Sequence, residues 1–180
     1  EKSGEATNDD HYPFESFTGG DEYDADALES LMVESGMWTA FRARPFNRVP
    51  ELGSRPHALF LTCTDTEPLC PSVDVVLKGN EEAFERGAKA LTSFASKETY
   101  LCVPKGSPFP NVTGASTHSF SGKHPSGLAG THINKLYPSS RKRVVWTIHL
   151  QDIIALGNLL KTGKLDVDRV VSIAGPQVNE

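Results

Sequence analysis

Apolar residues along this chain occur in two alternating patterns, short continuous runs and stripes with helical spacing. Continuous apolar runs are typical of strands buried on both faces of a parallel sheet, because a half-exposed strand alternates apolar and polar residues. We therefore predict strands, of which the third is the weakest, at 57–63, 98–103, 117–122, 144–150 and 169–175.

Segments with helical periodicity lie before and between these runs, at 24–36, 80–95, 124–138 and 151–163. The apolar stripe of the second segment consists of Phe84, Ala88, Leu91 and Phe94. Asp24 or Asp26 is expected to cap the first helix and Asn80 the second, because their side chains accept hydrogen bonds from free amides at a helix start.

Strands that alternate with amphipathic helices indicate βαβ units. We therefore predict an α/β fold of three layers over residues 24–180, with a mainly parallel sheet and helices on both faces. Residues 1–23 are polar and acidic, which predicts an extended arm or linker. Residues 1–30 hold ten Asp/Glu and one Lys, against 13 Asp/Glu and 17 Lys/Arg in the rest, so the acidity is concentrated toward the amino-terminal arm and the body is mildly basic.

The remaining composition excludes several classes of function. The mildly basic body lacks the clustered basic stripe of a nucleic-acid-binding protein, and its densest run, 141–143, is expected to be a solvated loop. No apolar run approaches the roughly 20 residues of a transmembrane helix. Cys63, Cys70 and Cys102 have no short CxxC spacing, which argues against structural zinc, an iron–sulfur cluster or a disulfide framework and favours a reducing compartment.

The stretch HPSGLAGTHINKLYP, residues 124–138, allows three interpretations. Ser126 could cap a helix whose first amides bind a phosphate, with Gly127 and Gly130 letting the ligand approach, but a bare GxxG is a weak signal. His124 and His132 could ligate a metal, yet they lack the i, i+4 spacing that places two imidazoles on one helical face.

The third interpretation, a packed helix, is favoured for this stretch. Ala129, Ile133 and Leu136 lie on one helical face, and Gly127 and Gly130 would permit close packing on the sheet. A ligand-facing role stays open for the amino-terminal part of the stretch, and the residues that would carry it are His124, Gly127, Gly130, Thr131 and His132.

A second candidate site is the segment 32–50, in which aromatic and arginine residues interleave. Such a mixture can bind a flat conjugated ligand by stacking and cation–π contact, and it also suits a protein interface. The competing interpretation is a loop that its aromatic side chains pin to the core. The residues expected to contact a ligand or partner are Trp38, Arg42, Arg44 and Phe46.

A third candidate follows the strand at 57–63, because ligands of open α/β sheets bind beyond the carboxyl ends of strands. Asp65 could bind a ligand there or cap a turn, and Cys70 is expected to be an inert loop thiol. His149 and Asp152 flank a strand–helix turn, where a structural role is favoured. No complete catalytic constellation is visible, so we name no catalytic residue and no metal ligand.

Several long runs occur in the order LMVESGMWTAFRARPFNRVP, ALFLTCTDTEPL, FSGKHPSGLAGTHI, VVWTIHLQDIIALGNLLKTG and RVVSIAGPQV. Together they strongly resemble the A subunit of the bacterial sodium-translocating NADH:quinone oxidoreductase, over about residues 14–178. Members of that family are considerably longer, so the chain is expected to be a central fragment of one.

The resemblance implies a Rossmann-like domain related to the flavin- and NADH-binding subunit of respiratory complex I. It implies a peripheral subunit on the cytoplasmic face of the bacterial inner membrane, in a sodium pump that passes electrons from NADH to quinone. Flavins and iron–sulfur clusters are expected on other subunits and no cofactor on this fragment. The membrane-embedded B subunit, other subunits of the complex and quinone are the expected partners.

Three positions depart from the family pattern: Asn134 and Thr147 stand where histidine is common, and Cys70 where a small non-thiol residue is common. These departures argue against a histidine-based metal site and a required redox thiol. We therefore expect a non-catalytic module that contributes to quinone-side architecture and to contacts between subunits. A degenerate nucleotide- or flavin-binding module and a purely structural scaffold remain as alternatives.

Overall fold

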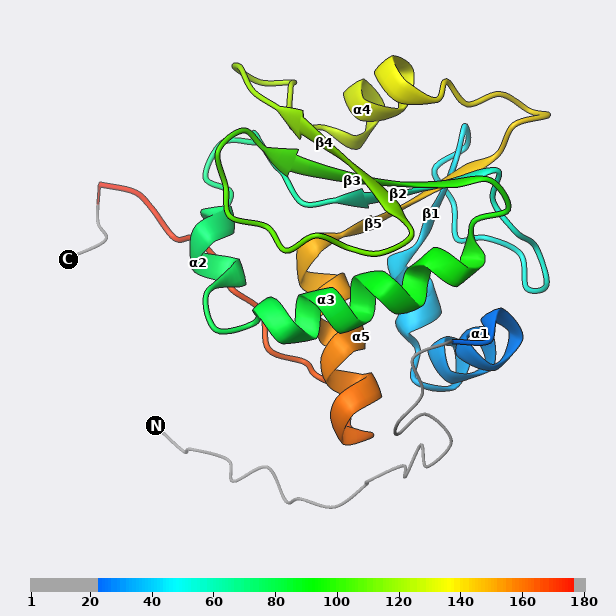
Figure 1. Ribbon diagram of the computed structural model, residues 1–180. Helices are drawn as coiled ribbons and strands as arrows, with labels where there is room; N and C mark the ends of the chain where they lie inside the picture. Colours follow the sequence, from blue (N-terminus) through cyan, green and yellow to red (C-terminus); the bar gives the residue numbers. More distant parts are fainter. Residues whose placement is uncertain (1–22, 177–180) are drawn as a thin grey trace.

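The structure, a computed structural model, describes residues 23–176 (Figure 1). Its helices are α1 (Ala25–Glu34), α2 (Val73–Leu77), α3 (Glu81–Leu91), α4 (Ala129–Leu136) and α5 (Leu150–Thr162), with short 3₁₀ helices at Met37–Ala40 and Thr92–Phe94. Its strands are β1 (Arg42–Arg44), β2 (Ala58–Thr62), β3 (Glu98–Pro104), β4 (Ala115–Phe120) and β5 (Val145–His149). The predicted acidic arm, except for Tyr23, lies outside the described residues.

The five strands form one sheet in the order β1-β5-β2-β3-β4. Strands β5, β2, β3 and β4 run parallel to their neighbours, and only β1 is antiparallel to β5. The predicted mainly parallel sheet is therefore confirmed. Strand β2 lies between β3 and β5. After β2 the chain adds β3 and β4 on one side of it, and later adds β5 on the other side. The carboxyl ends of β2 and β5 flank this topological switch.

Helices cover both faces of the sheet unequally, with α1, α3 and α5 on one face and α4 on the other (Figure 1). The larger core lies on the first face, where Leu59 and Leu61 of β2 and Trp146 and Ile148 of β5 meet the helices. The predicted stripe of the second helical segment is buried there and is thereby confirmed: Phe84, Ala88, Leu91 and Phe94. The second core is smaller, and in it the rings of Phe60 and Tyr100 stack at 4.9 Å.

Two glycines set the close contact between α3 and α5. A Cβ atom on Gly157 would lie 1.7 Å from the carbonyl oxygen of Ala83, and one on Gly87 would lie 2.1 Å from that of Ile153. Real Cβ atoms do not approach backbone oxygens so closely, so only glycine fits at these two positions. The contact positions α5, whose first turn forms part of the site described below.

The last predicted strand, 169–175, is wrong. The chain from 163 to 176 forms no helix or strand, and Val167, Val171 and Ile173 are exposed. Apolar β-branched residues predict a strand only where a neighbouring strand completes the hydrogen bonds. Conversely, β1 and α2 were not predicted, because three and five residues are too short to display a period.

Two of the predicted helix caps are also wrong. Asp24 does cap α1, since its Oδ2 accepts a hydrogen bond from the Ala27 amide at 2.9 Å. Asn80, however, donates from Nδ2 to the carbonyl oxygen of Val76. Ser126 donates to the carbonyl oxygen of Gly122, and α4 begins only at Ala129, so the packed helix is shorter than predicted.

Candidate functional site

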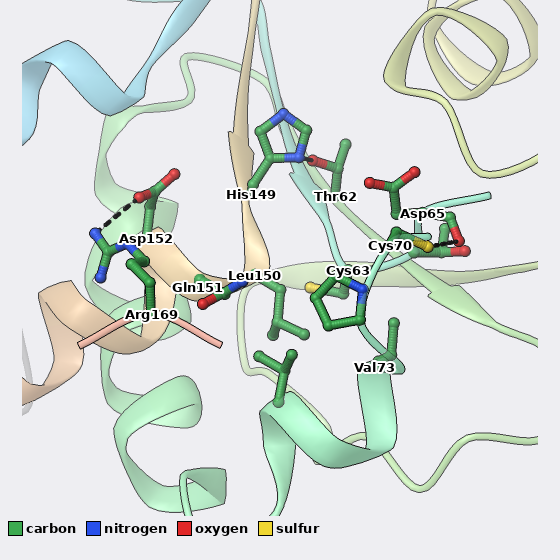
Figure 2. A pocket seen from close by; sticks show the side chains of 13 residues that line it. Thr62, Cys63, Asp65, Cys70, Val73, His149, Leu150, Gln151, Asp152 and Arg169 are labelled. Atoms are coloured by element: carbon green, nitrogen blue, oxygen red, sulfur yellow. Dashed lines mark hydrogen bonds and ion pairs between the residues drawn. The ribbon is translucent and has the colours of Figure 1, made fainter. Parts of the chain in front are cut away.

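A cavity of about 270 Å³ lies at the topological switch, and we call it the switch-point crevice. The register of the sheet places Thr62, the last residue of β2, directly beside His149, the last residue of β5. The crevice is lined by these residues, by the loop after β2, by the first turn of α5 and by Arg169 (Figure 2). This is the position at which open α/β sheets bind ligands.

Thr62 and His149 hold each other at the base of the crevice. The Thr62 hydroxyl donates to the carbonyl oxygen of Ile148 at 2.8 Å, and its oxygen is 3.2 Å from Nδ1 of His149. A hydroxyl has one hydrogen, so the second contact requires His149 to donate from Nδ1. In its neutral form, the exposed imidazole is then left with Nε2 as a free acceptor.

The first turn of α5 places a carboxylate on the other side of His149. Oδ1 of Asp152 is 3.3 Å from Nη2 of Arg169, and Figure 2 shows this ion pair at the edge of the crevice. Burial raises the pKa of Asp152 above its ordinary value, although Arg169, His149 and Arg42 lower it. The neighbouring cations therefore offset only part of the cost of removing this carboxylate from water.

The segment 164–170 lies against α5 and closes one side of the crevice. Gln151 binds the backbone of Val170 twice, by accepting from its amide at 2.8 Å and donating to its carbonyl oxygen at 3.0 Å. Nδ2 of Asn158 donates to Asp166 at 2.6 Å. Polar side chains of α5 therefore hold this segment in place of a neighbouring strand.

Two thiols line the crevice, and neither is activated. Burial raises the pKa of the Cys63 thiol well above its ordinary value. Burial, and secondly the charge of Asp65, raise the pKa of Cys70. Both cysteines are therefore protonated near neutral pH and are poor nucleophiles. Asp65 caps a turn, as one of its two interpretations predicted, because its Oδ1 accepts from the Glu67 amide at 2.8 Å.

The loop 122–128 is docked on the loop that follows β2. The Gly127 amide donates to the Thr66 hydroxyl at 3.1 Å, and Nδ1 of His124 lies 3.1 Å from the Thr66 carbonyl oxygen. A Cβ atom on Gly127 would lie 2.7 Å from the Thr66 backbone nitrogen. Gly127 is thus approached by the protein's own backbone and not by a ligand, which agrees with the prediction of a packed segment.

The other residues of this stretch are placed differently from one another. A Cβ atom on Gly130 would meet no heavy atom within 4 Å, so the predicted close packing of this glycine is wrong. The Thr131 hydroxyl donates to the carbonyl oxygen of Pro125 at 2.8 Å. His132 is fully buried against Phe120 and bonds the carbonyl oxygen of Ser126 through Nε2 at 3.0 Å.

The structure separates the four candidate contact residues of segment 32–50. Trp38 is only 5% exposed, and its indole donates to the carbonyl oxygen of Pro50, so the interpretation of a loop pinned to the core holds for this residue. Arg42 is half-buried beside the crevice and lines an adjoining cavity of about 570 Å³. Arg44 and Phe46 lie at the opposite end of β1. A role in quinone or partner contact stays a prediction for all four.

The structure assembles some groups that the sequence did not predict. Gln151 and Arg169 are far apart from Thr62 in the sequence, and no local signal marks them as neighbours of the crevice. Within residues 23–176, no three His, Cys, Asp or Glu side chains are grouped so as to hold a metal ion. None of the helices in this range is both long enough and apolar enough to cross a bilayer.

A family model described as "NqrA second alpha/beta domain" matches residues 23–165, which include every helix and strand named above. This chain belongs to that family. The sequence resemblance to the A subunit of the sodium-translocating reductase is thereby confirmed at the level of the family. The match ends at the start of the segment that lies against α5.

Relatives of this NqrA domain agree with the family model. The A subunit of the Na(+)-translocating NADH-quinone reductase of Marinomonas sp. is 44% identical over 174 residues, which cover 92% of this chain and 38% of the relative. The same protein of Rhodopirellula baltica is 46% identical over 151 residues, or 83% of this chain and 33% of the relative. That of Vibrio vulnificus is 40% identical over 178 residues, or 97% and 40%. The chain thus spans less than half the length of these curated relatives.

Proposed function

We propose that the chain is a non-catalytic module of a sodium-translocating NADH–quinone reductase and contributes to its quinone-side architecture and to contacts between its subunits. The observation that carries this proposal is that relatives named as the A subunit of such a reductase are 40–46% identical across nearly the whole chain. In this proposal the module sits peripherally on the cytoplasmic face of the membrane and associates with the membrane-embedded B subunit.

The chemistry of the crevice supports a module without a catalytic centre of its own. Its thiols are kept protonated, and Asp152 is paired with Arg169. Thr62 holds Nδ1 of His149, and within the described residues no hydroxyl or thiol is hydrogen-bonded to the free Nε2. An activated nucleophile requires an adjacent base within hydrogen-bond reach, and the described part of the crevice shows no such pair. Flavins and iron–sulfur clusters would then reside on other subunits.

Arg42, Arg44 and Phe46 are the proposed contacts with quinone or a neighbouring subunit. The test is the assembled complex in which the full-length protein carries Arg42→Ala or Phe46→Ala, with Lys97→Ala as a matched control on an exposed loop. We expect NADH oxidation by an artificial acceptor to stay unchanged, while quinone reduction or the association of subunits falls. Unchanged quinone reduction and association in both variants would remove the proposed contact role.

A degenerate nucleotide- or flavin-binding module is the second candidate function. The position of the crevice between the carboxyl ends of β2 and β5 favours it, since dinucleotides bind Rossmann folds at that point. Titration of the chain with NADH, FMN and FAD by calorimetry tests this candidate. Absence of heat at millimolar ligand would leave the scaffold role, whereas saturable heat that Thr62→Val weakens would support binding.

A further inference from the structure

Two loops that are distant in sequence lie side by side at the amino end of the parallel sheet (Figure 1). One is the turn that follows β1, and the other leads into β5. Arg44 is the register partner of Val145, two positions after Arg143. The backbones of Ala43 and Arg48 hydrogen-bond to each other, as do those of Ser140 and Arg143, which folds both loops back at this end.

These loops gather cations, most of which have no carboxylate partner in the described part of the chain. We call the group the basic rim, and it consists of Arg44, Phe46, Arg48, Arg141, Lys142 and Arg143. Arg48 has an acidic neighbour, Glu51, at 3.9 Å, and both side chains are largely exposed. Within residues 23–176 no carboxylate pairs with the other four cations. Glu98, at the start of β3 at the same end of the sheet, accepts a hydrogen bond from Tyr100.

Aromatic rings accompany the cations. Phe46 is 60% exposed, and the guanidinium of Arg48 lies 5.6 Å from its ring centroid. The guanidinium of Arg143 lies 5.8 Å from the ring of Tyr137. Nε of Arg44 is buried and has no acceptor. Phe46 thus exposes an apolar ring within a group of cations, and this combination suits contact with an anionic surface that also has an apolar layer.

We propose that the basic rim docks on the anionic surface of a lipid bilayer, with Phe46 at the level of the headgroups. Clusters of four to eight Lys/Arg bind anionic headgroups, and an aromatic side chain adds apolar contact at the interface. Projecting loop tips suit a fluid surface, which requires no shape complementarity. Interactions between exposed charges are screened within about 10 Å at moderate salt, so the attraction acts mainly at the rim and orients the domain.

The proposal deepens the proposed function, since it rests on a role in an ion-translocating and hence membrane-bound complex. For Arg44 and Phe46 it replaces the proposed contact with quinone or a neighbouring subunit by contact with the lipid surface, whereas Arg42 keeps that proposed contact. The surface that would face the bilayer lies at the end of the sheet opposite the switch-point crevice. A protein partner with an acidic surface is the competing occupant, and the experiment separates the two.

The experiment is co-sedimentation of the 180-residue chain with vesicles of phosphatidylcholine alone or mixed with an equal part of phosphatidylglycerol. We expect binding only to the anionic vesicles and its loss as salt is raised. The variant Arg141→Ala/Lys142→Ala/Arg143→Ala should lower the partition coefficient roughly a hundredfold. Phe46→Ala should lower it severalfold without changing its salt dependence.

The matched control Lys78→Ala/Lys105→Ala/Lys123→Ala removes three exposed charges elsewhere and should leave binding unchanged. The proposal is overturned if the unmodified chain does not bind anionic vesicles, or if both triple variants bind equally well. If the variant Arg141→Ala/Lys142→Ala/Arg143→Ala loses vesicle binding but still assembles into the complex, the result supports lipid docking by the rim and leaves the proposed function intact. Loss of assembly in the first triple variant without any vesicle binding would assign the rim to an acidic protein partner and overturn the lipid proposal.

Discussion

The two ends of the parallel sheet differ in whether their polar and charged side chains have partners within the described chain. At the carboxyl end, Thr62 binds His149 and Asp152 pairs with Arg169. At the amino end, Arg44, Arg141 and Arg143 have no carboxylate partner within the described residues. The first end is therefore organised by the chain itself, whereas the cations of the second are left to water or to an outside partner. Substitutions at the first end should affect folding, and those at the second should affect association.

The largest disruption of the carboxyl end of the sheet is expected from displacing α5, because its first turn lines the crevice. Gly157→Ala places a Cβ 1.7 Å from the carbonyl oxygen of Ala83. Backbone cannot yield as a flexible side chain can, so we expect a loss of about 3 kcal/mol or more in the free energy of unfolding. Urea unfolding followed by tryptophan fluorescence measures it, because Trp38 and Trp146 are both buried.

Gly130→Ala is the matched control, since a Cβ there meets no atom within 4 Å. We expect it to be neutral or to stabilise the chain by up to about 1 kcal/mol through helix propensity. Equal unfolding midpoints for the two variants would contradict the close helix contact.

A smaller effect is expected where the loop 122–128 meets the loop after β2. Gly127→Ala forces a Cβ against the Thr66 backbone, and we expect a cost of about 1–3 kcal/mol. Hydrogen exchange should rise together in peptides from both loops, because each supports the other. Ser126→Ala, which removes one hydrogen bond to Gly122, serves as the milder control. Faster exchange confined to 122–128 would show that the two loops are independent.

His132 gives the carboxyl end a pH dependence. Burial lowers its pKa from the ordinary value of 6.5, although the bond to Ser126 acts in the opposite direction. A proton added at Nδ1 would have no hydrogen-bond acceptor, because this buried atom has no partner. The unfolded chain therefore binds the proton more readily than the folded chain. The free energy of unfolding falls as the pH drops from about 6.5 through the lower pKa of the folded state. The loss is about 1.4 kcal/mol for each pH unit between the unfolded and folded pKa values.

Urea unfolding across pH 5–8, compared between the unmodified chain and His132→Phe, isolates this contribution. The variant has no proton to bind at this position, so its stability should fall less between the two pKa values. Parallel pH profiles would contradict a buried neutral imidazole.

The smallest effect on folding is expected at the amino end. Arg141→Ala/Lys142→Ala/Arg143→Ala removes exposed cations that no carboxylate of the described chain pairs with, so the free energy of unfolding should change by about 0.5 kcal/mol or less per position. Thermal unfolding by circular dichroism measures it alongside the vesicle assay. A large drop in the melting temperature would mean that the rim supports the fold, and the contrast between the two ends would disappear.

Much of the fold could be predicted because periodicity is a local property. The stripe at Phe84, Ala88 and Leu91 identified α3, and the apolar run around Phe60 identified β2, since each pattern requires only near neighbours. The candidate site was harder to predict. Arg169 was assigned to a strand, yet it pairs with Asp152, and Trp38 was an equal candidate for ligand contact and core until its neighbours were known.

The sequence by itself determined the alternation of strands and helices, the mainly parallel sheet and the family, because hydrophobic spacing and long runs of matching residues are readable along the chain. Only the tertiary structure decided which strand ends meet. The order of strands places Thr62 beside His149 and Arg44 beside β5. These pairings depend on contacts between segments separated by many residues, so a polar side chain acquires its partner, or lacks one, only when the sheet is assembled.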